Sequence, residues 1–286
     1  MSGRLTPVQR WILGPSAIFA DVNGFAVDRL GVKDESQRKE AYDFLTGASW
    51  GFQTTQDLLD QADILVQHGH RAEFAQTARM TELSPAGRAE FNDLLRQMCA
   101  LVRRKAAGPG SLGPAILRRL IVLRFGVSYA PLFDQLHGGG EDSVASTEML
   151  EVRSFLHSVF TDPDYADEEP KRLEMWLDPT FPREPSRYMI WDYARVMLLI
   201  RCGYMADWLP EPFCWDRLFM LAMDVQRHYT SWQDMATCYL QGRLMWSGGT
   251  AGRQKTFERC ASNLAADPDS PWNQVPWNLP LRRDWP

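Results

Sequence analysis

The sequence predicts an all-α protein, a single helical module of about ten helices over residues 1–286 with an irregular C-terminal tail rich in Trp and Pro. Three observations predict this class. Apolar residues recur at spacings of three and four over long stretches, capping residues precede several of these stretches, and alternating patterns typical of strands are scarce. At most a short hairpin is expected beside the helices. Trp272, Trp277 and Trp285 are expected to hold the tail against the body of the protein.

Helix starts are marked most clearly at two places. Ser84 is a suitable N-cap and Pro85 suits the first helical position, and the apolar residues that follow have helical spacing. Thr54 with Asp57 resembles a capping box, and the helix that it opens is expected to end at Gly69. The remaining helices are expected near residues 15–29, 36–48, 71–80, 114–125, 145–160, 187–203, 211–228, 231–246 and 252–264.

Two stretches lack a helical pattern. One is the Gly- and Pro-rich segment 108–114, and the other is the acidic, Pro-rich segment 162–186. The second separates an N-terminal helical half, residues 1–161, from a C-terminal half, residues 187–286, that carries most of the motifs. It is equally compatible with a long surface loop inside one domain. We therefore expect one module in which residues 162–186 are irregular and exposed.

Composition and charge exclude several classes of protein. Hydrophobic residues make up 45% and charged residues 23% of the chain, which is typical of a globular protein. The net charge of −5 disfavours nonspecific binding to nucleic acid. No apolar run approaches the length of a membrane span, and the N-terminal residues lack the apolar core of a signal peptide. The five cysteines form no CxxC pair, which favours a reducing compartment. These features predict a cytoplasmic protein that binds neither nucleic acid nor membranes.

One apolar segment, WDYARVMLLIRCGY, carries three charges. It is apolar on nearly every side of a helix, which is typical of a central helix. Asp192 and Arg195 share a face and can pair, whereas Arg201 lies nearly opposite. Since a buried unpaired charge is costly, other polar groups are expected to complete the pair. The pair is either a structural ion pair or the wall of a site in which Arg195 faces an anionic or carbonyl ligand.

The helix expected near residues 231–246 places Trp232, Tyr239, Arg243 and Trp246 on one face. An arginine among aromatic side chains is suited to stacking of its guanidinium group on a ring. If this face meets that of Arg195, the two form a basic, aromatic-lined pocket. The alternative is ordinary packing.

His68 and His70 stand two residues apart, as metal ligands sometimes do, but no third ligand follows at a suitable spacing. Phosphate-binding loops and the GxSxG motif are absent from the sequence. We therefore predict no metal site and no cofactor, and we assign no catalytic residue.

Short motifs of Trp, Tyr, Gly and Arg are spread over most of the chain. The C-terminal motifs are Trp191-Asp192, Arg195, Gly203-Tyr204, Tyr229, Ser231-Trp232, Tyr239, Gly242-Arg243, Trp246, Ser270-Pro271-Trp272 and Pro276-Trp277. The N-terminal motifs are Trp11, Ala17, Asn23, Ser49-Trp50-Gly51, Gly69-His70-Arg71 and Phe74. With these motifs the chain resembles the bacterial domain-of-unknown-function family 1266. Residues 108–185 carry no matching pattern. The resemblance implies one module and no established activity.

The polar motif residues coincide with the charged helix faces and define the candidate cluster, which is either ligand-binding or structural. The cluster comprises His70, Arg71, Asp192, Arg195, Tyr204, Trp232, Tyr239 and Arg243. The first hypothesis is a non-enzymatic binding or protein-interaction module with a protein partner, in a secretion or toxin–immunity context. The alternative is an enzyme acting on a small anionic substrate, with Arg195 and Arg243 as anion clamps and His70 as acid or base. An enzyme should bring these three residues to an open concavity, whereas a binding protein should enclose them.

Overall fold

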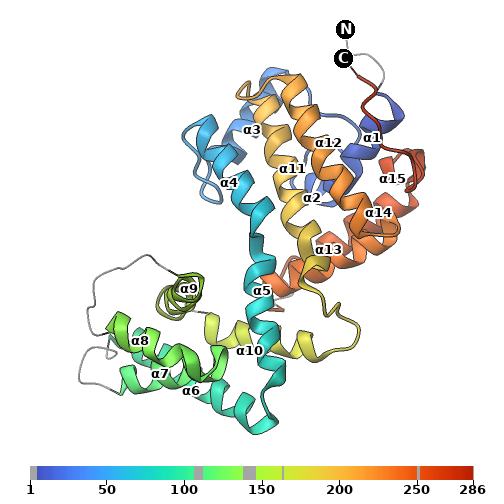
Figure 1. Cartoon of the computed structure of the whole chain (residues 1–286). Helices are drawn as coiled ribbons and strands as arrows, with labels where there is room; N and C mark the ends of the chain where they lie inside the picture. The colour runs from blue at the N-terminus through green and yellow to red at the C-terminus, as the bar shows by residue number, and fades with distance from the viewer. Residues whose placement is uncertain (1–4, 106–111, 138–145, 163, 250–251, 286) are drawn as a thin grey trace. The chain divides into compact units, whose positions relative to one another are not determined.

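The computed structural model describes residues 5–105, 112–137, 146–162, 164–249 and 252–285. Within these ranges the chain forms α-helices, labelled α1 to α15, and short 3-10 helices, and it contains no β-strand (Figure 1). The predicted all-α class is therefore confirmed. The helical starts at Thr54 and Ser84 are confirmed as well, because both side chains accept a hydrogen bond from a backbone N–H of the first turn.

The chain divides into two compact units, each built from segments that are distant in sequence. Unit 1 contains residues 1–72, 184–244 and 251–286, and unit 2 contains residues 73–183 and 245–250. That residues 1–286 act as one module stays a prediction.

The centre of unit 1 is helix α11, Met189–Met205. Every residue of α11 except Tyr204 is buried, so the apolar pattern correctly predicted a central helix. The helices that pack on α11 include α2 (Ala17–Val22), α3 (Glu35–Thr46), α4 (Thr55–Gln67) and α12 (Glu211–His228) (Figure 1). The charged residues of α11 therefore lie inside the unit.

The rest of unit 1 holds the C-terminal tail in place. Its helices are α1 (Pro7–Leu13), the first turn of α5, most of α13 (Trp232–Trp246), α14 (Gln254–Ala266) and the short α15 (Pro271–Gln274). The indole N–H groups of Trp272 and Trp277 donate to the backbone carbonyls of Gly14 and Tyr229, at 2.9 and 3.2 Å. Trp285 packs edge-on against a phenylalanine ring. The three tryptophans hold the tail as predicted.

Unit 2 contains α5 from Glu73 onward and the helices α6 to α10. The last of these, α10, lies in the segment 162–186 that was predicted to be a loop. Their bounds are α5 (Gly69–Arg79), α6 (Pro85–Arg103), α7 (Gly113–Phe125), α8 (Ala130–His137), α9 (Thr147–Thr161) and α10 (Tyr165–Leu177). Phe91, Leu120 and Phe155 lie in a shared apolar core that α10 completes. Unit 2 thus has its own core.

The prediction that residues 162–186 form an irregular exposed loop was wrong for most of that segment. Helix α10 occupies Tyr165–Leu177 and includes Pro170 in its interior. Tyr165, Leu173 and Trp176 have helical spacing and are buried, so apolar burial outweighs the hydrogen bond that Pro170 does not donate. A second correction concerns residues 15–29, where helix α2 ends at Val22 and a loop follows.

No helix in the described ranges combines the length and the apolar character needed to cross a bilayer. All five cysteines are buried and none is in a disulfide. The cytoplasmic location stays a prediction.

Candidate functional site

Asp192 is the centre of a buried polar cluster in unit 1. It lies on the first turn of α11, and its side chain is fully buried. Its Oδ1 accepts hydrogen bonds from the backbone N–H of His70 at 3.1 Å and from Arg195 Nη2 at 2.5 Å. Its Oδ2 accepts from Arg71 Nη1 at 3.4 Å. Four of the eight predicted cluster residues, two on the first turn of α5 and two on α11, are therefore brought together.

The surroundings of Asp192 keep it ionised. Burial by itself raises the pKa of a carboxyl group, but the hydrogen bonds from His70 and the positive charge of Arg195 outweigh burial and hold the pKa of Asp192 below its ordinary value. Arg71 also donates to the backbone carbonyls of Leu65 and Val66 at the end of α4. The carboxylate thus fastens the end of α4 and the start of α5 to α11.

His70 is part of the same contact. Its Nδ1 lies 2.7 Å from Arg195 Nη2 and 3.1 Å from Asp192 Oδ1. A neutral imidazole Nδ1 either donates or accepts, so the tautomer decides whether it donates to Asp192 or accepts from Arg195. His70 Nδ1 therefore lies between both members of the Asp192–Arg195 ion pair.

Gly69 lets the carboxylate approach the backbone. Its φ of +56° belongs to the left-handed region, and a Cβ there would lie 2.1 Å from Asp192 Oδ2. The motif Gly69-His70-Arg71 therefore supplies a glycine for close approach and then two partners for the carboxylate.

Gly69→Ala should destabilise the protein more than Gly51→Ala. Both glycines have positive φ, so each alanine adds a backbone strain of about 1–2 kcal/mol, but only the alanine at Gly69 would collide with Asp192. Nothing lies within 4 Å of the position of a Cβ on Gly51. Chemical denaturation of the two variants measures the difference. Equal losses of stability would contradict the close approach.

Arg201 faces away from this cluster and has a different role. Its side chain is fully buried and donates to the carbonyls of Leu30 at 3.2 Å and Arg29 at 2.8 Å, and also to the carbonyl of Ala26. It reaches the hydroxyl of Ser16 at 3.3 Å. Burial lowers the pKa of Arg201 to about 10. Arg201 thus fastens the loop after α2 to the central helix.

Of the other four predicted cluster residues, Tyr239 lies close enough to Arg195 and Arg243 to interact electrostatically with both. The ring of Tyr239 is fully buried between Trp191 and Phe257, at centroid distances of 5.5 and 6.2 Å. Arg243 donates to Gln254 at 2.8 Å, and its guanidinium group lies 4.5 Å from the centroid of the Phe257 ring. Arg243 therefore stacks on a ring of α14, which was not among the aromatic residues considered on its own helix.

Trp232 and Tyr204 lie outside the contacts of Asp192 described above. Trp232 packs among the indole rings of Trp11, Trp272 and Trp277. Tyr204, at the end of α11, donates to a carboxylate of α12 at 3.5 Å. Whether any of the eight residues binds a ligand stays a prediction.

Across the described ranges, no group of three or more His, Cys, Asp or Glu side chains is placed to hold a metal ion. His70 contacts Asp192 instead.

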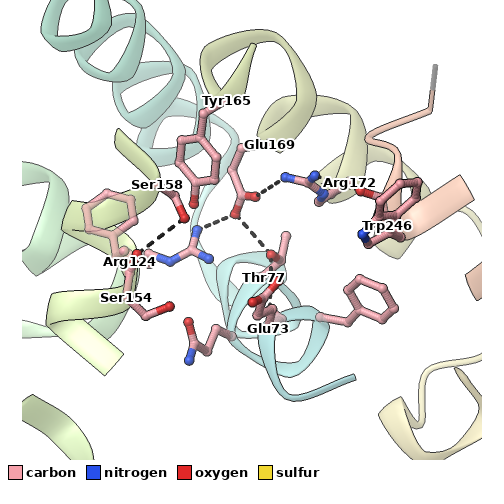
Figure 2. Close-up of a pocket in the computed structure, with 12 residues that line it drawn as sticks. Glu73, Thr77, Arg124, Ser154, Ser158, Tyr165, Glu169, Arg172 and Trp246 are labelled. Atoms are coloured by element: carbon pink, nitrogen blue, oxygen red, sulfur yellow. Dashed lines mark hydrogen bonds and ion pairs between the residues drawn. The ribbon is translucent and has the colours of Figure 1, made fainter. Parts of the chain in front are cut away.

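A second polar site lies within unit 2 and was not predicted. It is a cavity of about 40 Å³ lined by residues of α5, α7, α9 and α10 and by Trp246 (Figure 2). This volume exceeds what one water molecule needs. Polar side chains that line it include Thr77, Arg124, Tyr165 and Glu169.

A buried ion pair forms the wall of this cavity. Arg124 and Glu169 have side chains that are only 4% and 2% exposed, and Arg124 Nη1 donates to Glu169 Oε1. Glu169 also accepts from Thr77 at 3.0 Å and from Arg172 at 3.4 Å. Burial by itself raises the pKa of Glu169, but the two guanidinium groups outweigh burial and hold this pKa below its ordinary value. The pair is therefore charged at neutral pH.

One edge of the Arg124 guanidinium group donates no hydrogen bond to any residue that the structure describes. Both hydrogen bonds of Arg124 come from Nη1, to Glu169 and to the sulfur of Met80 at 3.6 Å. Nε is buried and has no partner within the ranges that the structure describes. Figure 2 shows the guanidinium group between Glu169 and Ser154 in the cavity wall. The Nε–Nη2 edge is the one that pairs with a planar oxyanion.

Few features of the sequence indicate this cavity. Arg124 lies in the last turn of α7, where a basic residue is expected from the helix dipole alone. Glu169 and Arg172 fall in the segment that was interpreted as a loop. Their i,i+3 spacing, together with the apolar residues on either side, was the signal that a helix interpretation could have used.

The family model described as "Protein of unknown function (DUF1266)" matches residues 47–277. This range is most of the chain and includes both the Asp192 cluster and the unit 2 cavity. It does not include the motif residues Trp11, Ala17 and Asn23. No curated protein and no solved structure matches the chain.

Proposed function

The chain belongs to the DUF1266 family, whose function is unknown, and from that premise we propose a non-enzymatic protein that binds a small ligand in the unit 2 cavity. In this proposal the ligand carries a carboxylate, and the cluster around Asp192 is structural. The observation that carries the proposal is the edge of the buried Arg124 guanidinium group that donates to no residue in the described ranges.

A small carboxylate matches that edge. Its two oxygens can accept from Nε–H and Nη2–H in parallel, the geometry in which arginine binds carboxylates most strongly. A buried N–H without an acceptor costs about 1–3 kcal/mol, so a ligand that fills this position recovers that energy. The cavity volume suits a group of a few heavy atoms. The ligand is therefore a small molecule or a small part of a larger one.

Binding is favoured over catalysis because the residues suggested for catalysis have structural contacts. Arg195 is enclosed, with an exposed side-chain fraction of 8%, and His70 contacts both Asp192 and Arg195 although 26% of its side chain is exposed. Arg243 is engaged by Gln254 and by the ring of Phe257. These contacts are typical of a cluster that holds helices in position, and they favour that role over proton transfer.

The test compares small molecules released from three natively purified proteins, the wild type, Arg124→Lys and the control Arg119→Lys. Lysine keeps a positive charge beside Glu169 but lacks the planar edge. Arg119 lies on the same helix, is half-exposed and pairs with Glu90, so it controls for the chemical change. Mass spectrometry should detect one carboxylate compound with the wild type and Arg119→Lys but not with Arg124→Lys.

Two outcomes would contradict the proposal. One is that the three proteins release the same compounds, or none, after incubation with an extract of the native cell. The other is that the wild type converts a compound of that extract and a His70→Ala variant does not. The second result would favour an enzyme acting on a small anionic substrate.

A further inference from the structure

We infer that the ligand of the unit 2 cavity is a small zwitterion of the α-amino acid class, with its carboxylate on Arg124 and its ammonium group facing Glu73. This inference rests on the proposed function, which requires only a carboxylate. It adds the second charge, the size and the orientation of the ligand.

The charged side chains that line the cavity are two of each sign, and Glu168 pairs with Arg172 outside this lining. The lining includes two arginines and two glutamates, which are Arg124, Arg172, Glu73 and Glu169. A ligand with one net charge would leave an imbalance in a site of low dielectric constant. A molecule with one positive and one negative group preserves the balance.

Two of the four charged groups are already engaged by the protein. Glu169 accepts from Arg124, Thr77 and Arg172. Arg172 also donates to Glu168 at 2.5 Å and to the carbonyls of Met245 and Trp246 at 2.8 and 3.0 Å. The groups left for a ligand are the Nε–Nη2 edge of Arg124 and the carboxylate of Glu73.

Glu73 is placed to meet an ammonium group at the mouth of the cavity. It is exposed, it lies one helical turn before Thr77 on α5, and Figure 2 shows it on the same side of the cavity as Thr77. Arg124 is buried, so the carboxylate of the ligand points inward and the ammonium group points toward solvent. The two protein charges thus define an inner and an outer end.

The hydroxyl groups of α9 suit the middle of such a ligand. Ser154 and Ser158 line the cavity one turn apart. The hydroxyl of Ser158 donates to the carbonyl of Ser154 at 3.2 Å, so its lone pairs are left to accept from an ammonium group. The cavity volume of about 40 Å³ leaves little room for a side chain. Glycine, alanine and serine are the amino acids of suitable size.

Titration calorimetry with the full chain tests the inference, with glycine, L-alanine and L-serine as probes. Propionate supplies the carboxylate alone and ethylammonium supplies the amine alone. At least one amino acid should bind about tenfold more tightly than either control. Glu73→Gln should weaken amino acid binding by about tenfold and leave propionate binding unchanged. Glu174→Gln, at an exposed position on α10, is the matched control and should change neither affinity.

The outcomes separate this inference from the proposed function. If propionate binds as tightly as the amino acids, and Glu73→Gln has no effect, the zwitterion is wrong and the carboxylate site stands. If no probe binds and the released compounds are unaffected by Arg124→Lys, both are wrong. Preferential binding of ethylammonium would also overturn both, because the cavity would then select cations.

Discussion

Replacing Asp192 by alanine is expected to lower the free energy of unfolding by roughly 3–5 kcal/mol. The variant removes the carboxylate that accepts from His70, Arg71 and Arg195, and Arg195 is left charged and buried. Loss of one partner from a buried ion pair is costly because the remaining charge has no compensation. Thermal and chemical denaturation of the purified variant measure the loss.

The double variant Asp192→Leu with Arg195→Met is the control. It removes both charges and keeps the volume of the site largely filled, so it should cost much less than the single change. Arg71 keeps its hydrogen bonds to the carbonyls of Leu65 and Val66 in both variants. A single variant as stable as the wild type would refute a buried structural pair and favour a solvent-open site.

The destabilisation should depend on pH in a defined direction. The pKa of Asp192 is lower in the folded protein than its ordinary value of 3.8. Its contribution to stability is therefore complete above about pH 4 and is lost as pH falls through the folded pKa. The difference in stability between the wild type and Asp192→Ala should be constant near neutral pH and should shrink in acid.

Arg201→Ala is expected to cost roughly 4 kcal/mol or more. A buried acceptor that loses its donor costs about 1–3 kcal/mol; the hydrogen bond from Arg201 to Leu30 is buried, and those to Ala26 and Arg29 are partly buried. A cavity also forms where the fully buried side chain stood. Chemical denaturation measures the total loss. Hydrogen exchange should show the loop after α2 opening first.

Arg217→Ala is the matched control for Arg201→Ala. Arg217 lies on α12, and its ion pair with Asp63 is exposed, so its removal should cost less than about 1 kcal/mol. Similar losses of stability in the two variants would contradict the role assigned to Arg201.

Local features of the sequence were sufficient for much of unit 1. The apolar pattern around Asp192 and Arg195 predicted a central helix, and the three-residue spacing predicted their ion pair. Capping residues such as Thr54 correctly marked helix starts. These predictions succeeded because each depends on residues within a few turns of one another.

Other features depend on contacts between distant parts of the chain. The carbonyl partners of Arg201 are more than 170 residues away, and backbone atoms carry no signal in a sequence. The partners Arg124 and Glu169 are 45 residues apart. Helix α10 was missed because Pro170 has a low helix propensity, whereas the burial of apolar side chains that stabilises this helix is not visible in local propensity. The unit 2 cavity could therefore not be predicted from patterns of neighbouring residues.

The contacts of Arg201 have a consequence for how the sequence can vary. Three of its acceptors are main-chain carbonyls, which every amino acid provides. The side chains of Ala26 and Arg29 can therefore change without loss of these hydrogen bonds, while Arg201 itself has no substitute with the same reach and number of donors. Among relatives of this chain, we expect the loop after α2 to drift in sequence while the arginine that holds it is retained.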